Sequence, residues 1–221
     1  MDSDTPAQPA PAAPSPDPLP EPFPEPLPDH GGGTWRGTRV LIASDWRALL
    51  EHLEVEQAPW FKRIYWMLLP SFLGLVLYRL SHCAHRGGWR NLGRALFLLK
   101  VYLTRMEISP TTVIGPGLVI SHASGVNLDG HIGARCLIFG QCNTGRSFGR
   151  REPGAASGLP VIGDDVTIGY GAMVLGGIRV GDGARIGPGA IVTTSVPPGA
   201  LVMWAVPRMM LASPAPRTDT D

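Results

Sequence analysis

Hydrophobic and polar positions repeat with a period of six residues from Ile108 to Pro197. Glycine follows six of the twelve leading positions, and the fifth position of the unit is mostly small. A period of six fits neither a helix, at about 3.6 residues per turn, nor one long strand. It is typical of a parallel β-helix, in which short strands turn a corner every six residues and three sides close one coil. The leading positions are all β-branched: Ile108, Ile114, Ile120, Val126, Ile132, Ile138, Ile162, Ile168, Val174, Val180, Ile186 and Val192.

The repeat predicts where each kind of side chain lies in the coil. The leading residue points inward, the small fifth residue fills the crowded interior, and glycine permits tight corners. Successive coils pair as parallel strands about 4.8 Å apart. Cys136 and Cys142 both occupy the fifth position, so we expect them to fill the core. With Cys83 they do not suggest a disulfide framework, and a reducing cytoplasm is the simplest location.

The repeat lapses for eighteen residues between its two blocks. At Thr144, Arg150 and Ala156 the apolar leading residue is missing, and the period resumes in phase at Ile162. We therefore predict a loop over residues 144–161 that leaves a β-helix domain spanning residues 107–203. Long loops without their own secondary structure are usually functional or disordered.

The sequence before the repeat divides into a tail and a helical region. Residues 1–28 hold eleven prolines and lack the apolar core of a signal peptide, which predicts a disordered tail over residues 1–36. Residues 37–106 are expected to be helical, with Ser44 capping one helix, a buried helix starting near Pro70, and another from Trp89 to about Thr104. Residues 204–221 form a C-terminal tail.

One uncharged stretch raises the question of a membrane. Residues 64–78 carry no charge, but fifteen residues fall short of a membrane span and Pro70 would interrupt a helix. A location at the membrane surface stays open, because the aromatic and basic residues from Trp60 to Arg63 suit an interface. The near-zero net charge of +1, without a basic stripe, argues against nucleic acid as a partner.

Four motifs in residues 70–208 resemble the serine acetyltransferase branch of the hexapeptide acyltransferases. The stretch P-S-F-L-G-L-V-L-Y-R-L-S-H resembles the helix before the β-helix of that family, and M-E-I-S-P resembles the start of its first coil. I-S-H-A-S-G resembles its catalytic repeat, and V-P-P-G-A with A-V-P-R resembles its exit. The resemblance implies a mainly β fold, a left-handed parallel β-helix of hexapeptide repeats preceded by an α-helical N-terminal region. It also implies acetyl transfer from acetyl-CoA to a hydroxyl.

The resemblance also implies which residues carry the chemistry. His122 matches the base that takes the proton of the hydroxyl, and Glu107 matches the carboxylate that orients it. Fifteen residues separate the two, so the spacing permits the pair without compelling it. For CoA, the resemblance points to a groove between prisms, and the positions that match it are Gly145, Ala172, Ala190 and Arg208. Such a groove requires a homotrimer or a dimer of trimers.

No metal is expected, because metal-dependent relatives on this scaffold need three converging histidines. The repeats contain only His122 and His131.

The chain departs from the family where the acceptor is recognised. The family has an aspartate before the catalytic histidine, and this chain has Ser121. An Arg-His-Pro at the return of the loop is replaced by Gly158, Leu159 and Pro160, and an upstream Arg-Asp-Pro-Ala by residues 56–59. A carboxylate-bearing acceptor wants a guanidinium, which Arg146, Arg150 or Arg151 could supply from the loop.

Three hypotheses therefore stay open. The first is an acetyl-CoA-dependent O-acetyltransferase acting on a small acceptor, closest to serine O-acetyltransferase. The second places the acceptor on a polysaccharide or lipid-linked sugar at a membrane, and the third makes the prism a non-catalytic scaffold.

Overall fold

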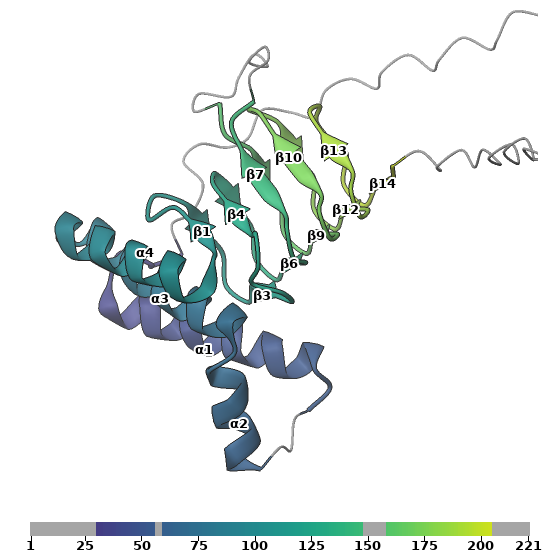
Figure 1. Cartoon of the computed structure of the whole chain (residues 1–221). Helices are drawn as coiled ribbons and strands as arrows, with labels where there is room; N and C mark the ends of the chain where they lie inside the picture. Colours follow the sequence, from purple (N-terminus) through teal and green to yellow (C-terminus); the bar gives the residue numbers. More distant parts are fainter. Residues whose placement is uncertain (1–29, 56–58, 148–157, 205–221) are drawn as a thin grey trace, which may run out of the picture.

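The computed structural model describes residues 30–55, 59–147 and 158–204. Helices form one end of the molecule and a three-sided prism of short strands forms the rest (Figure 1). The predicted tails lie almost wholly outside the described residues, as do Arg150, Arg151 and Arg208.

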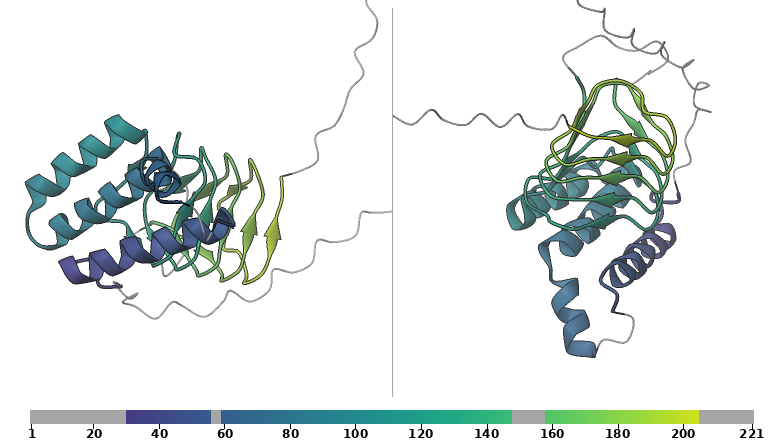
Figure 2. Two further views of the ribbon diagram at one scale, coloured as in Figure 1. Left: turned by 90° about the horizontal axis from the view of Figure 1, so that it is seen from below. Right: turned by 90° about the vertical axis from the view of Figure 1, so that its right-hand side faces the viewer.

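Three parallel sheets build the prism, one for each side of the coil. Figure 2 shows the coils stacked along the prism axis. Every pairing between neighbouring strands of the described chain is parallel. Sheet A contains β1 (Glu107–Ile108), β4 (Asn127–Leu128), β7 (Asn143–Gly145), β10 (Met173–Leu175) and β13 (Ile191–Val192). Sheet B contains β2 (Val113–Ile114), β5 (His131–Ile132), β8 (Val161–Ile162) and β11 (Arg179–Val180). Sheet C contains β3 (Val119–Ile120), β6 (Leu137–Ile138), β9 (Thr167–Ile168), β12 (Arg185–Ile186) and β14 (Leu201–Val202).

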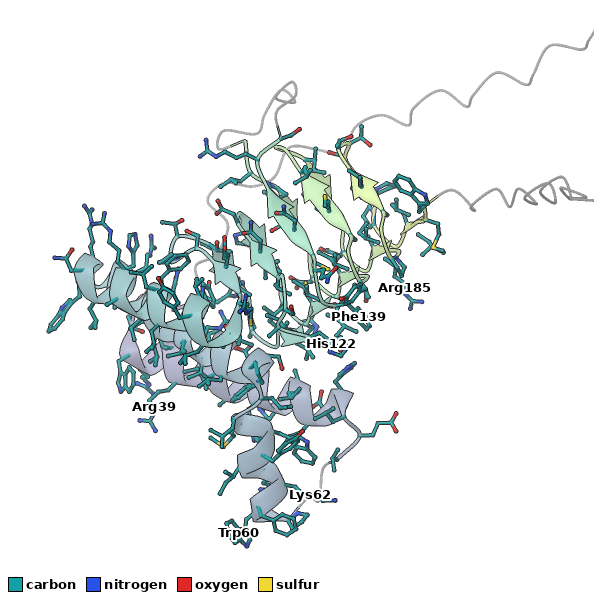
Figure 3. The ribbon with its side chains drawn as sticks, viewed as in Figure 1. Arg39, Trp60, Lys62, His122, Phe139 and Arg185 are labelled. Carbon is teal, nitrogen blue, oxygen red and sulfur yellow. The ribbon has the colours of Figure 1, made fainter. Side chains whose placement is uncertain are left out.

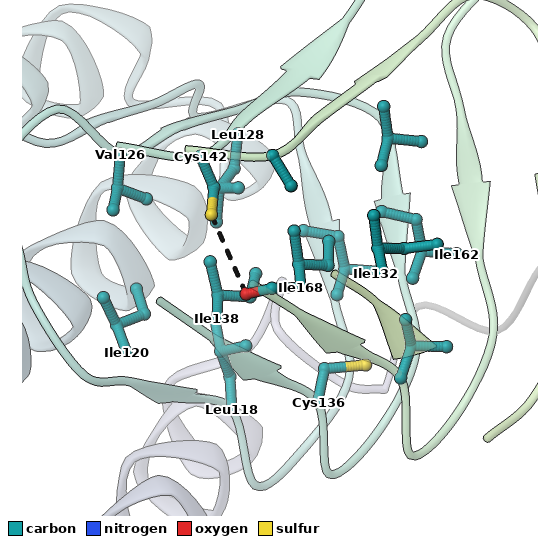
Figure 4. Packing of buried hydrophobic residues seen from close by; sticks show 14 of the residues in the cluster. Leu118, Ile120, Val126, Leu128, Ile132, Cys136, Ile138, Cys142, Ile162 and Ile168 are labelled. Carbon is teal, nitrogen blue, oxygen red and sulfur yellow. Dashed lines mark hydrogen bonds between the residues drawn. The ribbon is translucent and has the colours of Figure 1, made fainter. Parts of the chain in front are cut away.

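The prism interior is filled as the repeat predicts. All twelve leading residues are buried, and Figure 4 shows several of them stacked in the core. Cys136 and Cys142 are buried among them, and burial raises the pKa of these thiols to about 12 and about 11. Both cysteines are free, so they act as small apolar side chains rather than as reactive groups.

The register departs from the strict six-residue count at one corner. Ile108 pairs with Leu128, not with Val126, because eight residues separate the inward-facing Ile120 and Leu128. Only four residues then separate Leu128 from Ile132, so the period is restored at once. Val126 is still buried, but it lies in the corner that precedes the strand.

The predicted loop begins too early at Thr144. This residue lies in β7, pairs with Leu128 on one side and Val174 on the other, and is buried. Its hydroxyl donates to the carbonyl of Asp129, so a polar residue occupies an inward position with its hydrogen bond made. The loop therefore leaves the prism after Gly145 and rejoins it at Val161, where β8 begins.

The glycine that follows each leading residue and the left-handed corner turn are at different positions, which the sequence did not distinguish. The glycine after the leading residue lies directly under the next coil: a Cβ on Gly133 would stand 2.4 Å from the carbonyl oxygen of Gly163. The left-handed turn comes two residues later, and Arg135 adopts it with φ of 55°. The repeat glycines are thus needed for close stacking of the coils.

The helical region contains one more helix than predicted and starts earlier. The helix α1 (Trp35–His52) begins nine residues before Ser44, because the side chain of Thr34 accepts from the amide of Gly37 and caps it. The helix α3 (Pro70–Arg86) begins where predicted, and α4 (Arg90–Thr104) lies within one residue of its predicted bounds. Between them and α1, α2 (Trp60–Met67) projects away from the body (Figure 1).

A buried ion pair joins the helices to the first coil. Asp45 of α1 and Arg79 of α3 meet at 2.9 Å, and Arg79 also donates to the carbonyls of Ile114 and Gly115. Asp45 accepts from the amides of Gly117 and Leu118 as well. Because every polar group of this pair is satisfied by the prism or its partner, the helices and the first coil form one unit.

No single helix in the described chain is long and apolar enough to cross a bilayer, but α2 and α3 pass that test as a pair bent by 65°.

Candidate functional site

His122 lies at the corner between sheet C and sheet A. It follows β3 by two residues, its side chain is exposed, and Figure 3 shows it on the flank of the prism. The corner is the one lengthened by two residues between Ile120 and Leu128. The longer corner carries the histidine on the outside of the prism while Ala123 and Val126 stay buried beneath it.

Gly140 and Tyr170 continue the same edge on the next two coils. A Cβ on Gly140 would stand 3.0 Å from the Cβ of His122 and 2.8 Å from the ring of Tyr170. Gly140 therefore lies between the side chains of His122 and Tyr170. These two can lie close together because Gly140 has no side chain. Tyr170 is 45% exposed, so its ring and phenol are open to a ligand beside His122. We call this row of His122, Gly140 and Tyr170 the histidine edge.

Two backbone donors on the histidine edge lack an acceptor in the part of the chain that the structure describes. Within the residues that the structure describes, the amide N–H groups of Gly140 and Tyr170 make no hydrogen bond. Their neighbours do: the amide of Gly171 donates to the carbonyl of Gly140, and that of Gly189 to the carbonyl of Tyr170. Two unpaired donors on successive coils suit the carbonyl oxygens of an extended ligand that runs along the prism.

Glu107 lies on the outer face of sheet A, where its neighbour on the next coil is Asn127. No hydrogen bond or ion pair joins Glu107 to His122 in the described chain, so the structure does not form the predicted contact. Instead, the charge of Glu107 interacts with that of Lys100 in α4. This lysine is fully buried and donates to the carbonyl of Ile108. Burial lowers the pKa of Lys100 to about 7, and the charge of Glu107 opposes that shift.

The other positions predicted to bind CoA are less available to a ligand than their spacing suggests. Ala172 and Ala190 stack one coil apart, but both side chains are buried and both amides already donate within their corners, to Gly169 and Gly187. Gly145 is half-buried at the end of β7, where its carbonyl accepts from Gly176. Arg208 lies outside the described residues.

The region predicted to recognise the acceptor is only partly described. Ser121 is half-buried at the end of β3, and its amide donates to the carbonyl of Ile138. At the return of the loop, Gly158 and Pro160 are buried, and the carbonyl of Pro160 accepts from His131. Arg146 is exposed just after β7, the described arginine at the base of the loop.

Titratable groups elsewhere do not form a second site of this kind. His131 is half-buried on sheet B, where burial lowers its pKa. His82 is buried against Tyr78, with its Nδ1 2.9 Å from the carbonyl oxygen of Pro110, so it packs the helix on the prism. Among the described residues no cluster of histidine, cysteine or carboxylate side chains could hold a metal ion.

Sequence reasoning missed Tyr170 and Lys100. Tyr170 carried a signal, because it is the one aromatic residue in the I-G-x-G-A corners, which otherwise hold small residues or proline. Lys100 carried none: its helix position lies among leucines and arginines, and only the packing of α4 on β1 shows that it is buried.

Comparison with known proteins places these features in a family. Residues 160–194 match the family model described as "Bacterial transferase hexapeptide (six repeats)". A serine acetyltransferase of Helicobacter pylori strain J99 is 36% identical over 144 residues, which are 63% of this chain and 80% of that protein. The serine acetyltransferase of Escherichia coli K12 is 33% identical over 169 residues, 70% of this chain and 57% of that protein.

Solved structures agree with the sequence relatives. The crystal structure of Neisseria gonorrhoeae serine acetyltransferase in complex with serine has a TM-score of 0.66 and 26% identity, covering 80% of this chain and 70% of that one. The soybean serine acetyltransferase apoenzyme has a TM-score of 0.64 and 30% identity, covering 74% of this chain and 65% of that one. The prism is accordingly a left-handed β-helix. From its repeats, its helical N-terminal region and its relatives, this chain belongs to the serine acetyltransferase family of acyltransferases.

Proposed function

We propose that this protein transfers the acetyl group of acetyl-CoA to a hydroxyl of a small acceptor, with His122 as general base. The observation that carries the proposal is the match to a serine acetyltransferase over 80% of that protein, with His122 exposed on a prism edge beside unpaired backbone donors. The scaffold alternative does not account for an exposed histidine on the one lengthened corner between strands of the described coils.

The chemistry follows from the histidine and the hydroxyl. Neutral His122 accepts the hydroxyl proton as the acceptor oxygen attacks the thioester carbonyl, and the carbon–sulfur bond breaks. The imidazolium then returns the proton to the departing thiolate, so the enzyme ends in its starting state. In this proposal the amides of Gly140 and Tyr170, on adjacent coils, bind carbonyl oxygens of the pantetheine arm, and the support is that both amides lack an acceptor in the described chain.

Glu107 acts in this proposal as the group that orients the imidazole. It lies on the sheet that borders the histidine edge, one coil below Asn127. The side chains of Glu107 and His122 are both exposed, and hydrogen bonds between catalytic groups often form or tighten only when substrate is present.

The acceptor is proposed to differ from that of serine acetyltransferases in how it is held. The Neisseria gonorrhoeae relative was solved with serine. In this chain the loop returns as Gly158, Leu159 and Pro160, without a guanidinium there, and Ser121 stands before the histidine. Arg146 is the described cation at the base of the loop and the proposed partner of an acceptor carboxylate.

The experiment is thiol release from acetyl-CoA across a panel of acceptors: L-serine, L-homoserine, L-threonine and a hexose. Acceptor-dependent release supports the transferase, and the preferred hydroxyl identifies the class of acceptor. Absence of CoA binding by calorimetry, together with no release for any acceptor, would make the prism a scaffold and end the proposal.

Two further parts of the proposal concern assembly and location. We propose a homotrimer, because a three-sided prism packs about a three-fold axis and a groove between copies would enclose the histidine edge. Light scattering of the purified chain tests it. The three free cysteines support a cytoplasmic location, which fractionation tests.

A further inference from the structure

The helix α2 has an apolar face that points away from the protein. On a helix of about 3.6 residues per turn, five of its residues and the residue that follows it fall on one side, and all six are exposed. They are Trp60, Phe61, Ile64, Tyr65, Met67 and the following Leu68. Trp60 is 73% exposed and lies with Lys62 at the far end of α2 from the prism (Figure 3).

The opposite side of α2 faces the body. Trp66 is half-buried there, and Lys62 and Arg63 lie on either side of it around the helix. This distribution is the reverse of a helix that packs on its own protein, which buries its apolar side. It is the distribution of a helix that lies in the plane of a membrane, with aromatic residues at the boundary and long basic side chains at its flanks.

The charge carried by α2 and the two helices that follow it is of one sign. From Pro59 to Met106 the chain has eight Lys or Arg residues and no Asp or Glu. Arg79 and Lys100 are buried, and the other six are exposed: Lys62, Arg63, Arg86, Arg90, Arg94 and Arg105. A second copy of the same surface would bring like charges together, whereas anionic lipid is complementary to both the charge and the apolar face.

The neighbouring helix limits how α2 can meet a bilayer. The bent pair of α2 and α3 has the length and composition of a span, but α3 buries Phe72, Leu75 and Tyr78, and Arg79 of α3 holds Asp45. Because α3 is held in the protein, α2 is the member of this bent pair that is left to contact lipid. We propose that α2 docks this protein on an anionic membrane surface by its apolar face, without crossing the bilayer.

The test is sedimentation of the full-length protein with vesicles of phosphatidylcholine alone and of phosphatidylcholine mixed with phosphatidylglycerol. We expect binding to the anionic vesicles, loss of binding at high salt, and little binding to the neutral ones. Trp60→Ser/Phe61→Ser should weaken binding at least about tenfold, and Lys62→Gln about fivefold. The matched control is Met203→Ser/Trp204→Ser, which removes two similarly exposed residues from the far end of the prism.

Each other occupant of α2 has its own result, and each overturns the proposal. If vesicles are not bound and Trp60→Ser/Phe61→Ser lowers the mass by light scattering, the face is covered by a second copy. If vesicles are not bound and the variant instead speeds proteolysis of residues 1–29, the face is covered by that segment, which has six Asp or Glu and no Lys or Arg. Equal binding to both vesicle types would overturn the proposed preference for an anionic membrane surface. Because α2 has no fully buried residue, the variants should keep the melting temperature of the parent.

Discussion

Two edges of the same prism treat their corner amides in opposite ways. Between sheets B and C, the amide of Ala134 donates to Asp164 at 2.8 Å, and the amide of Asp164 donates to Asp182 at 2.8 Å. On the histidine edge between sheets C and A, the equivalent amides of Gly140 and Tyr170 make no hydrogen bond in the described chain. We call the first the aspartate edge; Asp45 of α1 caps two amides at its start.

The difference separates corners whose amides are satisfied within the protein from the corner that is proposed to bind a ligand. Carboxylates on the aspartate edge satisfy the amides of Ala134 and Asp164 and pair with Arg135, so these two donors are not left for a ligand. The histidine edge leaves its donors to be satisfied from outside, and it carries an exposed histidine and tyrosine beside them. One repeat therefore gives both kinds of edge, according to which side chains occupy the corners.

The largest effect is expected from the histidine edge itself. Replacing His122 by alanine removes the proposed base, and kcat should fall by about 10² to 10⁴. Thiol release under saturating acetyl-CoA measures it. His131→Ala on sheet B is the control, and an unchanged rate in His122→Ala would contradict the mechanism.

A second prediction uses the gap between His122 and Tyr170. In Gly140→Ala the new methyl group would meet the ring of Tyr170 at 2.8 Å, so both side chains must shift. We expect kcat to fall by about 10²-fold, since small displacements of a catalytic group are costly. The double variant Gly140→Ala/Tyr170→Ala should regain much of the loss, because the ring is gone. If the double variant is no better than the single one, crowding of the edge is not the cause.

A third prediction compares how the two edges are anchored to the helices. The aspartate edge begins at the ion pair of Asp45 and Arg79. Sheet A begins at β1, whose Ile108 accepts a hydrogen bond from the buried Lys100. The pKa of Lys100 is about 7 in the folded protein against an ordinary 10.5, so above pH 7 the unfolded chain holds a proton that the folded one does not. Stability should therefore rise with pH, at up to about 1.4 kcal/mol per unit.

Urea unfolding from pH 7 to about 8.5 measures that slope, below the range in which cysteine ionises on unfolding. The buried thiols act in the opposite sense at higher pH, because their raised pKa values favour the unfolded state there. Lys100→Met should remove the slope, and Lys62→Met on exposed α2 should leave it. A slope that persists in Lys100→Met would assign it to another group.

The smallest effect is expected on the aspartate edge. Asp164→Ala leaves the amide of Ala134 without its acceptor and removes one partner of Arg135, at a cost of about 1 kcal/mol in unfolding free energy. Thiol release should be unchanged, since this edge is proposed to bind no substrate. A loss of activity without a loss of stability would erase the distinction between the edges.

Much of the prism could be predicted because its signal is local and repeated. Each leading residue is β-branched and buried, so twelve separate positions agree. The prediction failed where a polar residue kept an inward position: Thr144 satisfies its hydroxyl on Asp129, which a pattern of apolar residues cannot show. It failed also at α1, where the serine-aspartate pair in mid-helix looks like a cap and the true cap is Thr34.

The site was less predictable because it depends on contacts between coils. The exposed corner of His122 follows from the repeat, but its nearness to Tyr170 depends on Gly140 being bare. The pairing of Glu107 with Asn127, rather than with a residue nearer His122, depends on the two extra residues of one corner. Neither of these two contacts can be predicted from the spacing along the sequence, because each contact joins residues on different coils.

That corner has a consequence for how such a chain can change. Eight residues between Ile120 and Leu128 are offset by four between Leu128 and Ile132, so later strands keep their inward faces. A single deletion between residues 121 and 127 would turn the remaining strands inside out, because side chains alternate along a strand. Length can therefore change at a corner by exchange with the adjoining corner, as here, or by a loop that leaves the prism, as after Gly145. Insertions and deletions reach the corner of His122 only under these restrictions, while point substitutions reach it freely.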